Sequence, residues 1–110
     1  MSTRLPTAIV VSALLRRVND AGGMAAVRAR GDAQAGGVLA VLVDRAGSTR
    51  VVERGVGPNG RESLIDSTPS NGGDVDEYWR RRRSRDPDLW VIELDIPAAE
   101  RFAVESLLAD

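Results

Sequence analysis

The chain has 110 residues, a mass of 11.8 kDa and a formal net charge of -1, which is the size of one small domain. It contains no cysteine and no histidine, and all 15 of its basic residues are arginine. These absences exclude disulfides, thiolate nucleophiles, zinc sites with sulfur ligands, an imidazole general base and lysine Schiff-base chemistry. An enzyme built from this chain would depend on carboxylates, hydroxyls and guanidinium groups.

The first third of the chain predicts one helix followed by a strand. Apolar residues spaced by three and four positions indicate a helix from about Thr7, which Gly22 and Gly23 end. Residues 24–30 then alternate, with small apolar side chains on one side and Arg28 and Arg30 together on the other. This alternation is typical of a half-buried strand with a basic outer face.

Two further strands are expected at residues 38–43 and 49–54, each after a turn rich in glycine and polar residues. The run from Val38 to Val43 is apolar throughout, as in a central strand covered on both faces. Three consecutive strands with short connections predict an antiparallel meander. A mobile loop is expected at about residues 56–73, because this segment is rich in glycine, proline, serine and asparagine.

The last third predicts a helix, a strand and a helix. Asp74 suits the helix N-cap, and Asp86-Pro87-Asp88 ends that helix. Residues 89–95 form the clearest strand, and Pro97 suits the start of the closing helix. The fold class is therefore α+β in the order α-β-β-β-α-β-α. We expect a single domain over residues 1–110, with one mainly antiparallel four-stranded sheet and helices packed on one face. Trp79, Trp90 and Phe102 are expected to meet in one cluster.

Several segments resemble one protein family. They are Leu14-Leu15-Arg16-Arg17, Ala21-Gly22, Arg30-Gly31-Asp32 with Ala35-Gly36, Gly57-Pro58, Asp76-Glu77-Tyr78 and, most specifically, Asp86-Pro87-Asp88-Leu89-Trp90-Val91-Ile92-Glu93. From about Arg4 to Glu93 the chain resembles an uncharacterised domain-of-unknown-function family of small alphaproteobacterial proteins. The resemblance implies one intact bacterial domain, and it carries over no activity, ligand or catalytic residue.

Arginines give the most conspicuous candidate site. The run from Arg80 to Arg83 is typical of an anion or nucleic-acid surface, with Tyr78 and Trp79 as stacking groups. The alternative is a solvated helix on which Asp76 and Glu77 pair with arginines four residues later. The candidate anion-binding residues are Arg16, Arg17, Arg28, Arg30, Arg80 and Arg81. Spacing alone does not decide whether they converge.

No metal or cofactor site is predicted. Asp74, Asp76, Asp86 and Asp88 bracket the second helix, but a cap, a surface position and a turn explain them. The glycines of residues 31–37 lack the spacing of a phosphate-binding loop.

Three functions remain open from the sequence. The absence of cysteine, histidine and lysine favours a non-enzymatic binding or adaptor domain. We expect it to form a homo-oligomer, because a four-stranded sheet has edges to protect. The second is an arginine-mediated binder of phosphate, nucleic acid or an acidic protein. The third is a carboxylate-dependent hydrolase using Asp86, Asp88 or Glu93. With no cysteine, export signal or membrane segment in view, we expect a cytoplasmic protein that does not bind membranes.

Overall fold

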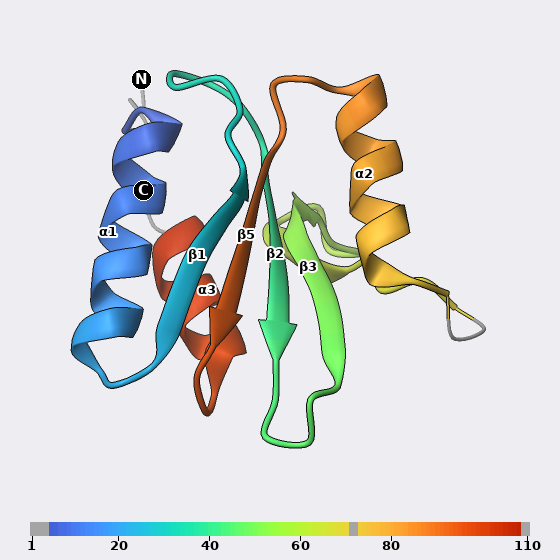
Figure 1. Cartoon of the computed structure of the whole chain (residues 1–110). Helices are drawn as coiled ribbons and strands as arrows, with labels where there is room; N and C mark the ends of the chain where they lie inside the picture. The colour runs from blue at the N-terminus through green and yellow to red at the C-terminus, as the bar shows by residue number, and fades with distance from the viewer. Residues whose placement is uncertain (1–4, 71–72, 109–110) are drawn as a thin grey trace.

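The structure, a computed structural model, describes residues 5–70 and 73–108 (Figure 1). Within these residues the elements are α1 (Thr7–Asp20), β1 (Met24–Ala29), β2 (Val38–Val43), β3 (Thr49–Val56), β4 (Glu62–Asp66), α2 (Val75–Arg85), β5 (Trp90–Asp95) and α3 (Ala99–Leu107). The α+β class and the predicted starts of the first two helices are confirmed. None of the described helices has the length and apolar character needed to cross a membrane.

The sheet has five strands in the order β1-β5-β2-β3-β4, so the predicted four-stranded sheet is wrong. The predicted meander is also wrong, because β5 lies between β1 and β2. It pairs antiparallel with β1 and parallel with β2. The reason is burial: β2 and β5 are both apolar on two sides along most of their length and therefore take central positions. Strand β1, with small and exposed side chains, is left at an edge.

The additional strand, β4, lies inside the segment expected to be one long loop. A turn at residues 57–61 reverses the chain: the amide of Gly57 donates to the carbonyl oxygen of Arg61 at 2.8 Å, and Gly60 has a φ of +78°. β4 then pairs antiparallel with β3 from Glu62 to Asp66. Pro58-Asn59-Gly60 lie in the segment predicted as a mobile loop, although they form a hairpin turn. Residues 71 and 72 of the expected mobile loop lie outside the described residues.

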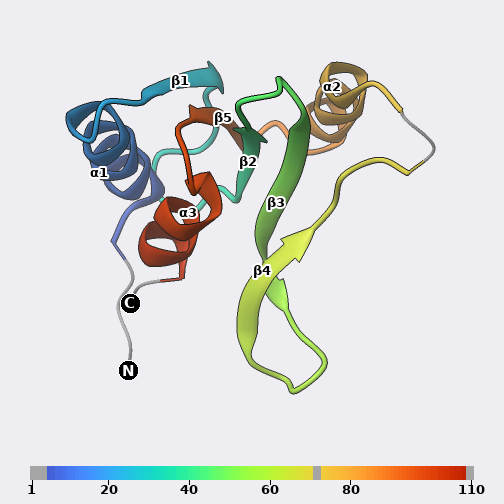
Figure 2. The same ribbon diagram turned by 90° about the horizontal axis from the view of Figure 1, so that it is seen from below.

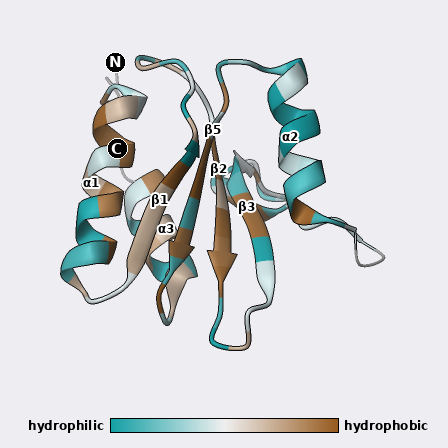
Figure 3. Cartoon of the chain, viewed as in Figure 1, coloured by the Kyte–Doolittle hydropathy of each residue, from teal (hydrophilic) through white to brown (hydrophobic). Residues whose placement is uncertain are grey.

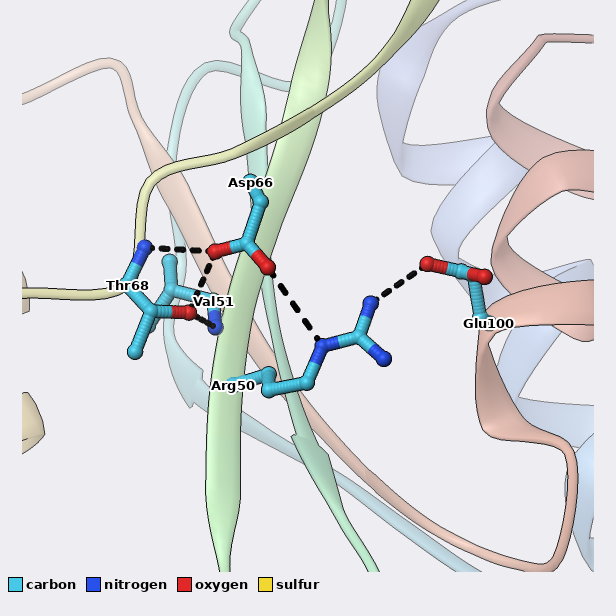
Figure 4. A network of polar contacts seen from close by, with 5 residues as sticks. All are labelled: Arg50, Val51, Asp66, Thr68 and Glu100. Atoms are coloured by element: carbon cyan, nitrogen blue, oxygen red, sulfur yellow. Dashed lines mark hydrogen bonds and ion pairs between the residues drawn. The ribbon is translucent and has the colours of Figure 1, made fainter.

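A polar network holds the end of β4 against β3 (Figure 4). The carboxylate of Asp66 accepts hydrogen bonds from the amide and hydroxyl of Thr68, and the Thr68 hydroxyl oxygen accepts from the amide of Val51 at 2.9 Å. The Arg50 guanidinium bridges Asp66, at 3.5 Å, and Glu100 of α3. The hydrogen bonds from Thr68, and secondarily the charge of Arg50, lower the pKa of Asp66.

Helices cover both faces of the sheet, so the predicted packing on one face is wrong. Helices α1 and α3 lie together on one face, and α2 lies on the other beside β3 (Figure 2). The alternation along β2 explains this arrangement: Ala40 and Leu42 belong to the core under α1 and α3, while Leu39 and Val41 belong to the core under α2. β2 is hydrophobic throughout, whereas α2 is largely hydrophilic (Figure 3). Both sides of this strand must be removed from water, as its continuous apolar run predicted.

The three large aromatic residues do not form the one cluster expected of them. Trp90 is 1% exposed and packs with Phe102 in the core under α1 and α3, whereas Trp79 lies in the core under α2. The sheet separates them, since consecutive layers of this fold have separate apolar cores.

Residues 31–37 and 86–90 are joined by a set of close backbone contacts, which we call the clasp. The amide of Asp32 donates to the carbonyl oxygen of Asp88 at 3.0 Å, and the indole N–H of Trp90 donates to the carbonyl oxygen of Asp32 at 2.8 Å. The approach requires glycine, because a Cβ atom at Gly31 or Gly36 would lie 2.1 Å from the Asp88 carbonyl oxygen. The clasp therefore fixes where β5 enters the sheet.

The clasp also supports the start of α1. Pro6 occupies the N-cap position and no side chain caps this helix. Instead, the amides of Thr7 and Ala8 donate to the carbonyl oxygens of Gln34 and Ala33, at 3.2 and 2.9 Å. These bonds satisfy donors that a helix start otherwise leaves without a partner.

Replacing Gly36 with alanine tests the clasp. We expect Gly36→Ala to lower the free energy of unfolding by about 3 kcal/mol, because the new Cβ must displace the Asp88 backbone. The neighbouring Gly37→Ala is the control: the nearest atom to its Cβ is Leu89 Cδ1, at an ordinary contact distance of 3.5 Å. Urea unfolding followed by tryptophan fluorescence measures both. Equal losses in the two variants would contradict this account of the clasp.

Candidate functional site

A β-bulge in β1 separates the side chains of Arg28 and Arg30. The pairing of β1 with β5 shifts between Val27 and Ala29, which leaves Arg28 as the extra residue. The Arg28 guanidinium reaches Glu93 of β5 at 3.3 Å on the α2 side of the sheet. Arg30 follows the end of the strand and lies over the ring of Trp90, 5.0 Å from its centroid. The predicted basic strand face shared by these two arginines is therefore wrong.

Within the described residues, helix α2 covers only part of its face of the sheet: it packs over Val91 of β5, but most of this face of β1 and β5 has no helix over it (Figures 1 and 2). Pairing in register places side chains of neighbouring strands on one side. The uncovered side chains, which we call the open face, are Met24, Ala26, Arg28, Val43, Thr49, Glu93 and Asp95. Met24 is 74% exposed, and Ala26, Thr49 and Asp95 are exposed as well.

A cleft of about 350 Å³ lies where the open face meets the start of α2. Its lining comes from four strands and one helix: Arg28, Val41, Val43, Thr49, Asp74, Val75, Asp76 and Glu93. The apolar part of its lining is Val41 and Val43 of β2 and Val75 of α2, and these side chains can accept aliphatic groups. The Asp74 carboxylate caps α2 by accepting from the amides of Asp76 and Glu77, at 2.8 and 3.3 Å, which confirms its predicted role.

The charge of this cleft is predominantly negative. Its three carboxylates face one guanidinium, that of Arg28, which already pairs with Glu93. Asp95 on the open face adds a fourth carboxylate in the next row of the sheet. Such a surface attracts cations, and its apolar part suits the aliphatic stem of an arginine or lysine side chain.

The six candidate arginines do not gather on one surface. Arg16 and Arg17 lie on α1, on the face of the sheet opposite α2. Arg17 is bound internally, because it donates to Ser106 at 2.7 Å, pairs with Glu105 at 2.5 Å and lies over Phe102. Arg28 belongs to the open face, and Arg30 precedes the clasp and lies over Trp90. Arg80 and Arg81 line one common depression, on the outer side of α2.

The arginines of α2 divide into two inward and three outward residues. Arg82 pairs with Glu53 of β3 through two hydrogen bonds of 2.7 and 2.8 Å. Arg83 donates to the carbonyl oxygens of Pro87 and Arg30, at 2.7 and 2.9 Å, and so holds the end of α2 to the clasp. The outward residues Arg80, Arg81 and Arg85 have no ion pair within the described part of the chain.

The Glu53–Arg82 pair is the most enclosed ion pair among the described residues, and it anchors α2 on β3. Glu53 also accepts a hydrogen bond from the hydroxyl of Ser67, and Arg82 donates to the hydroxyl oxygen of Tyr78 at 2.7 Å. The hydrogen bonds from Arg82, then that from Ser67, lower the pKa of Glu53 against the opposing effect of its burial. The same pair raises the pKa of Arg82.

The acids proposed for a hydrolase have structural contacts. Asp86 accepts from the amide of Asp88 in the turn after α2, at 3.2 Å, and Glu93 pairs with Arg28. Both aspartates are exposed and belong to the segment that forms the clasp. Within residues 5–70 and 73–108 no three acidic side chains come together as metal ligands would.

These features define a class: a small α+β domain with a mixed five-stranded sheet, covered by two helices on one face and half-covered by one helix on the other. A family model described as "Protein of unknown function (DUF1491)" matches residues 5–104, and the chain belongs to this family. The resemblance seen in the sequence is thereby confirmed. No curated protein matches the chain.

Solved structures of similar proteins have the same fold. A crystal structure of a DUF1491 family protein from Caulobacter crescentus is 36% identical, with a TM-score of 0.78 over 90% of this chain and 94% of that one. An NMR structure of a DUF1491 family protein from the same species is 35% identical, with a TM-score of 0.76 and coverage of 92% and 94%. Protein Atu0922 from A. tumefaciens is 28% identical, with a TM-score of 0.68 and coverage of 86% and 87%.

The sequence predicts little of the open face. It singles out Glu93 only as an acid for hydrolysis and predicts no more than strand positions for Val43, Thr49 and Asp95. The available signal was the alternation of β5, which puts Glu93 and Asp95 on one side. That signal shows a polar stripe, but it does not show that α2 leaves the stripe uncovered.

Replacing Glu53 with glutamine tests the anchor of α2. At pH 7 we expect Glu53→Gln to lower the free energy of unfolding by about 2 kcal/mol, because the half-buried Arg82 loses its charged partner. A lowered pKa means that the carboxylate stabilises the fold above its unfolded pKa of about 4.3, and that this contribution disappears as the pH falls through the folded pKa. The difference between the native chain and the variant should therefore shrink from pH 6 to pH 3.

The control is Glu62→Gln, which removes the exposed pair between Glu62 and Arg54 at 3.4 Å. It should cost less than about 1 kcal/mol, as exposed ion pairs do. Chemical denaturation at several pH values measures both variants. A pH-independent loss in Glu53→Gln would show that the charge of Glu53 does not anchor α2.

Proposed function

We propose that this chain is a non-enzymatic, cytoplasmic binding module that holds a basic segment of a partner protein on its open face. The proposal is carried by one observation: the cleft between the open face and α2 combines apolar walls with three carboxylates and a single arginine. The chain thus presents a surface suited to recognition, while its candidate catalytic acids serve in turns and ion pairs.

The geometry supports an extended arginine- or lysine-bearing segment as the occupant. The open face crosses β1, β5, β2 and β3, so a ligand lying on it would meet Glu93, Thr49 and the start of α2 together. Carboxylates bind guanidinium and ammonium groups through charge-assisted hydrogen bonds. The stems of the same side chains would cover Val43 and Met24, which are otherwise in contact with water.

An acetylated hexapeptide of alternating arginine and leucine is a suitable probe. We expect it to bind at low salt and to shift the amide NMR signals of β1, β5 and β2, with weaker binding as salt is raised. Ala26→Arg places a cation on the open face at an exposed position, and it should weaken binding by about tenfold, the loss of one charge-assisted contact.

Val104→Arg is the matched control, because Val104 is 40% exposed on α3, on the opposite face of the sheet. It adds the same charge and should leave peptide binding nearly unchanged. A hexapeptide of alternating glutamate and leucine should not bind. Equal binding of the two peptides, or equal loss in the two variants, would exclude the open face as the binding surface.

Self-association is the second candidate, and the edge position of β1 favours it. Among the described residues β1 pairs only with β5, so its other edge can pair with a second copy except at Ala25, whose amide donates to the side-chain oxygen of Asn19 at 3.2 Å. The bulge at Arg28 limits regular pairing to the first part of the strand. Light scattering at several protein concentrations tests this, because a dimer raises the apparent mass as the concentration rises. A monomer at every concentration would remove this candidate and leave the peptide-binding proposal standing.

A further inference from the structure

The outer side of α2 carries a second surface that the proposed function does not use. Its residues Glu77, Arg80, Arg81 and Ser84 line a shallow depression of about 360 Å³. We propose that this surface binds the phosphate backbone of a nucleic acid, with Arg80 and Arg81 as the phosphate-binding residues.

The first support is that both guanidinium groups are available. The sequence pattern predicted that Asp76 and Glu77 would neutralise them, but neither of these ion pairs is among those of the described residues. The Asp76 carboxylate instead accepts from the indole N–H of Trp79 at 3.1 Å. Arg80 lies over the ring of Trp79, 5.1 Å from its centroid. Stacking uses the flat side of the guanidinium and leaves its N–H donors free in a fixed plane.

The second support is rigidity beneath the surface. Arg82 and Arg83, on the inner side of the same helix, bind Glu53 and two backbone carbonyl oxygens. They hold α2 in place, so Arg80 and Arg81 lie on a fixed support. A site of this kind loses less conformational entropy when a ligand binds.

The other two lining residues favour a nucleic acid over an acidic peptide. The hydroxyl of Ser84 donates to the carbonyl oxygen of Arg81 at 2.8 Å, so its oxygen remains an acceptor toward the depression. Glu77 adds a carboxylate there. Glu77 repels any anion, but a nucleotide offers imide, amino or hydroxyl donors beside its phosphate that this carboxylate can accept, whereas ionised Asp and Glu side chains offer none.

Fluorescence anisotropy with labelled oligothymidylate and oligouridylate of about 12 nucleotides tests this proposal. We expect binding at low salt, with a slope of log affinity against log salt of about -1.4 for two phosphate contacts on a single strand. Arg81→Ala should weaken binding several-fold and reduce that slope by about 0.7. The oligonucleotide that binds with the higher affinity identifies DNA or RNA as the preferred ligand.

Arg16→Ala is the matched control, because Arg16 is an exposed arginine on α1 with no ion pair among the described residues. It should leave affinity and slope unchanged, and circular dichroism should show all variants folded. Three results would overturn the proposal: no binding of either strand at low salt, an equal loss in Arg16→Ala, or competition by hexaglutamate as strong as that by unlabelled oligonucleotide. The last result would assign the surface to an acidic protein. None of these results bears on the open face, which lies elsewhere.

Discussion

The backbone of residues 31–36 approaches the carbonyl oxygen of Asp88 so closely that only glycine fits at the contact. Gly31 and Gly36 flank this oxygen, the amide of Asp32 donates to it, and the indole of Trp90 bonds the same turn from the core side. From this contact β5 enters the centre of the sheet, α1 obtains carbonyl partners for its first amides, and Arg83 ties in the end of α2. Elements distant in sequence therefore depend on one backbone contact.

The clasp also gives a structural role to two of the segments on which the predicted family resemblance was based. Arg30-Gly31-Asp32 and Asp86-Pro87-Asp88-Leu89-Trp90 face each other across the clasp. Their glycines, aspartates and tryptophan act as packing and backbone partners. Other residues of the resembling segments line the candidate surfaces: Glu93 and Asp76 the cleft at the open face, and Glu77 the depression on α2.

Charge is segregated along α2, although the net charge of the chain is only -1. Carboxylates surround the start of the helix and guanidinium groups its second half, which is the polarity that the helix dipole favours. The two proposed surfaces lie at these two places: the open face beside Asp74 and Asp76, and the phosphate-binding surface around Arg80 and Arg81. The net charge and isoelectric point of the whole chain do not reveal either surface, because the opposite charges cancel.

Local patterns in the sequence were sufficient for the α+β class, for α1 and α2 with their ends, and for the two-sided burial of β2, because helical spacing, caps and apolar runs are properties of neighbouring residues. They were insufficient for the strand order, the fifth strand, the bulge at Arg28 and the division of the arginines between inner and outer positions. Those depend on which distant segment completes each element's burial and hydrogen bonding. The placement of β5 between β1 and β2 was decided by pairs of residues 52 positions apart for β2 and 62 to 71 positions apart for β1, and no local pattern encodes that choice.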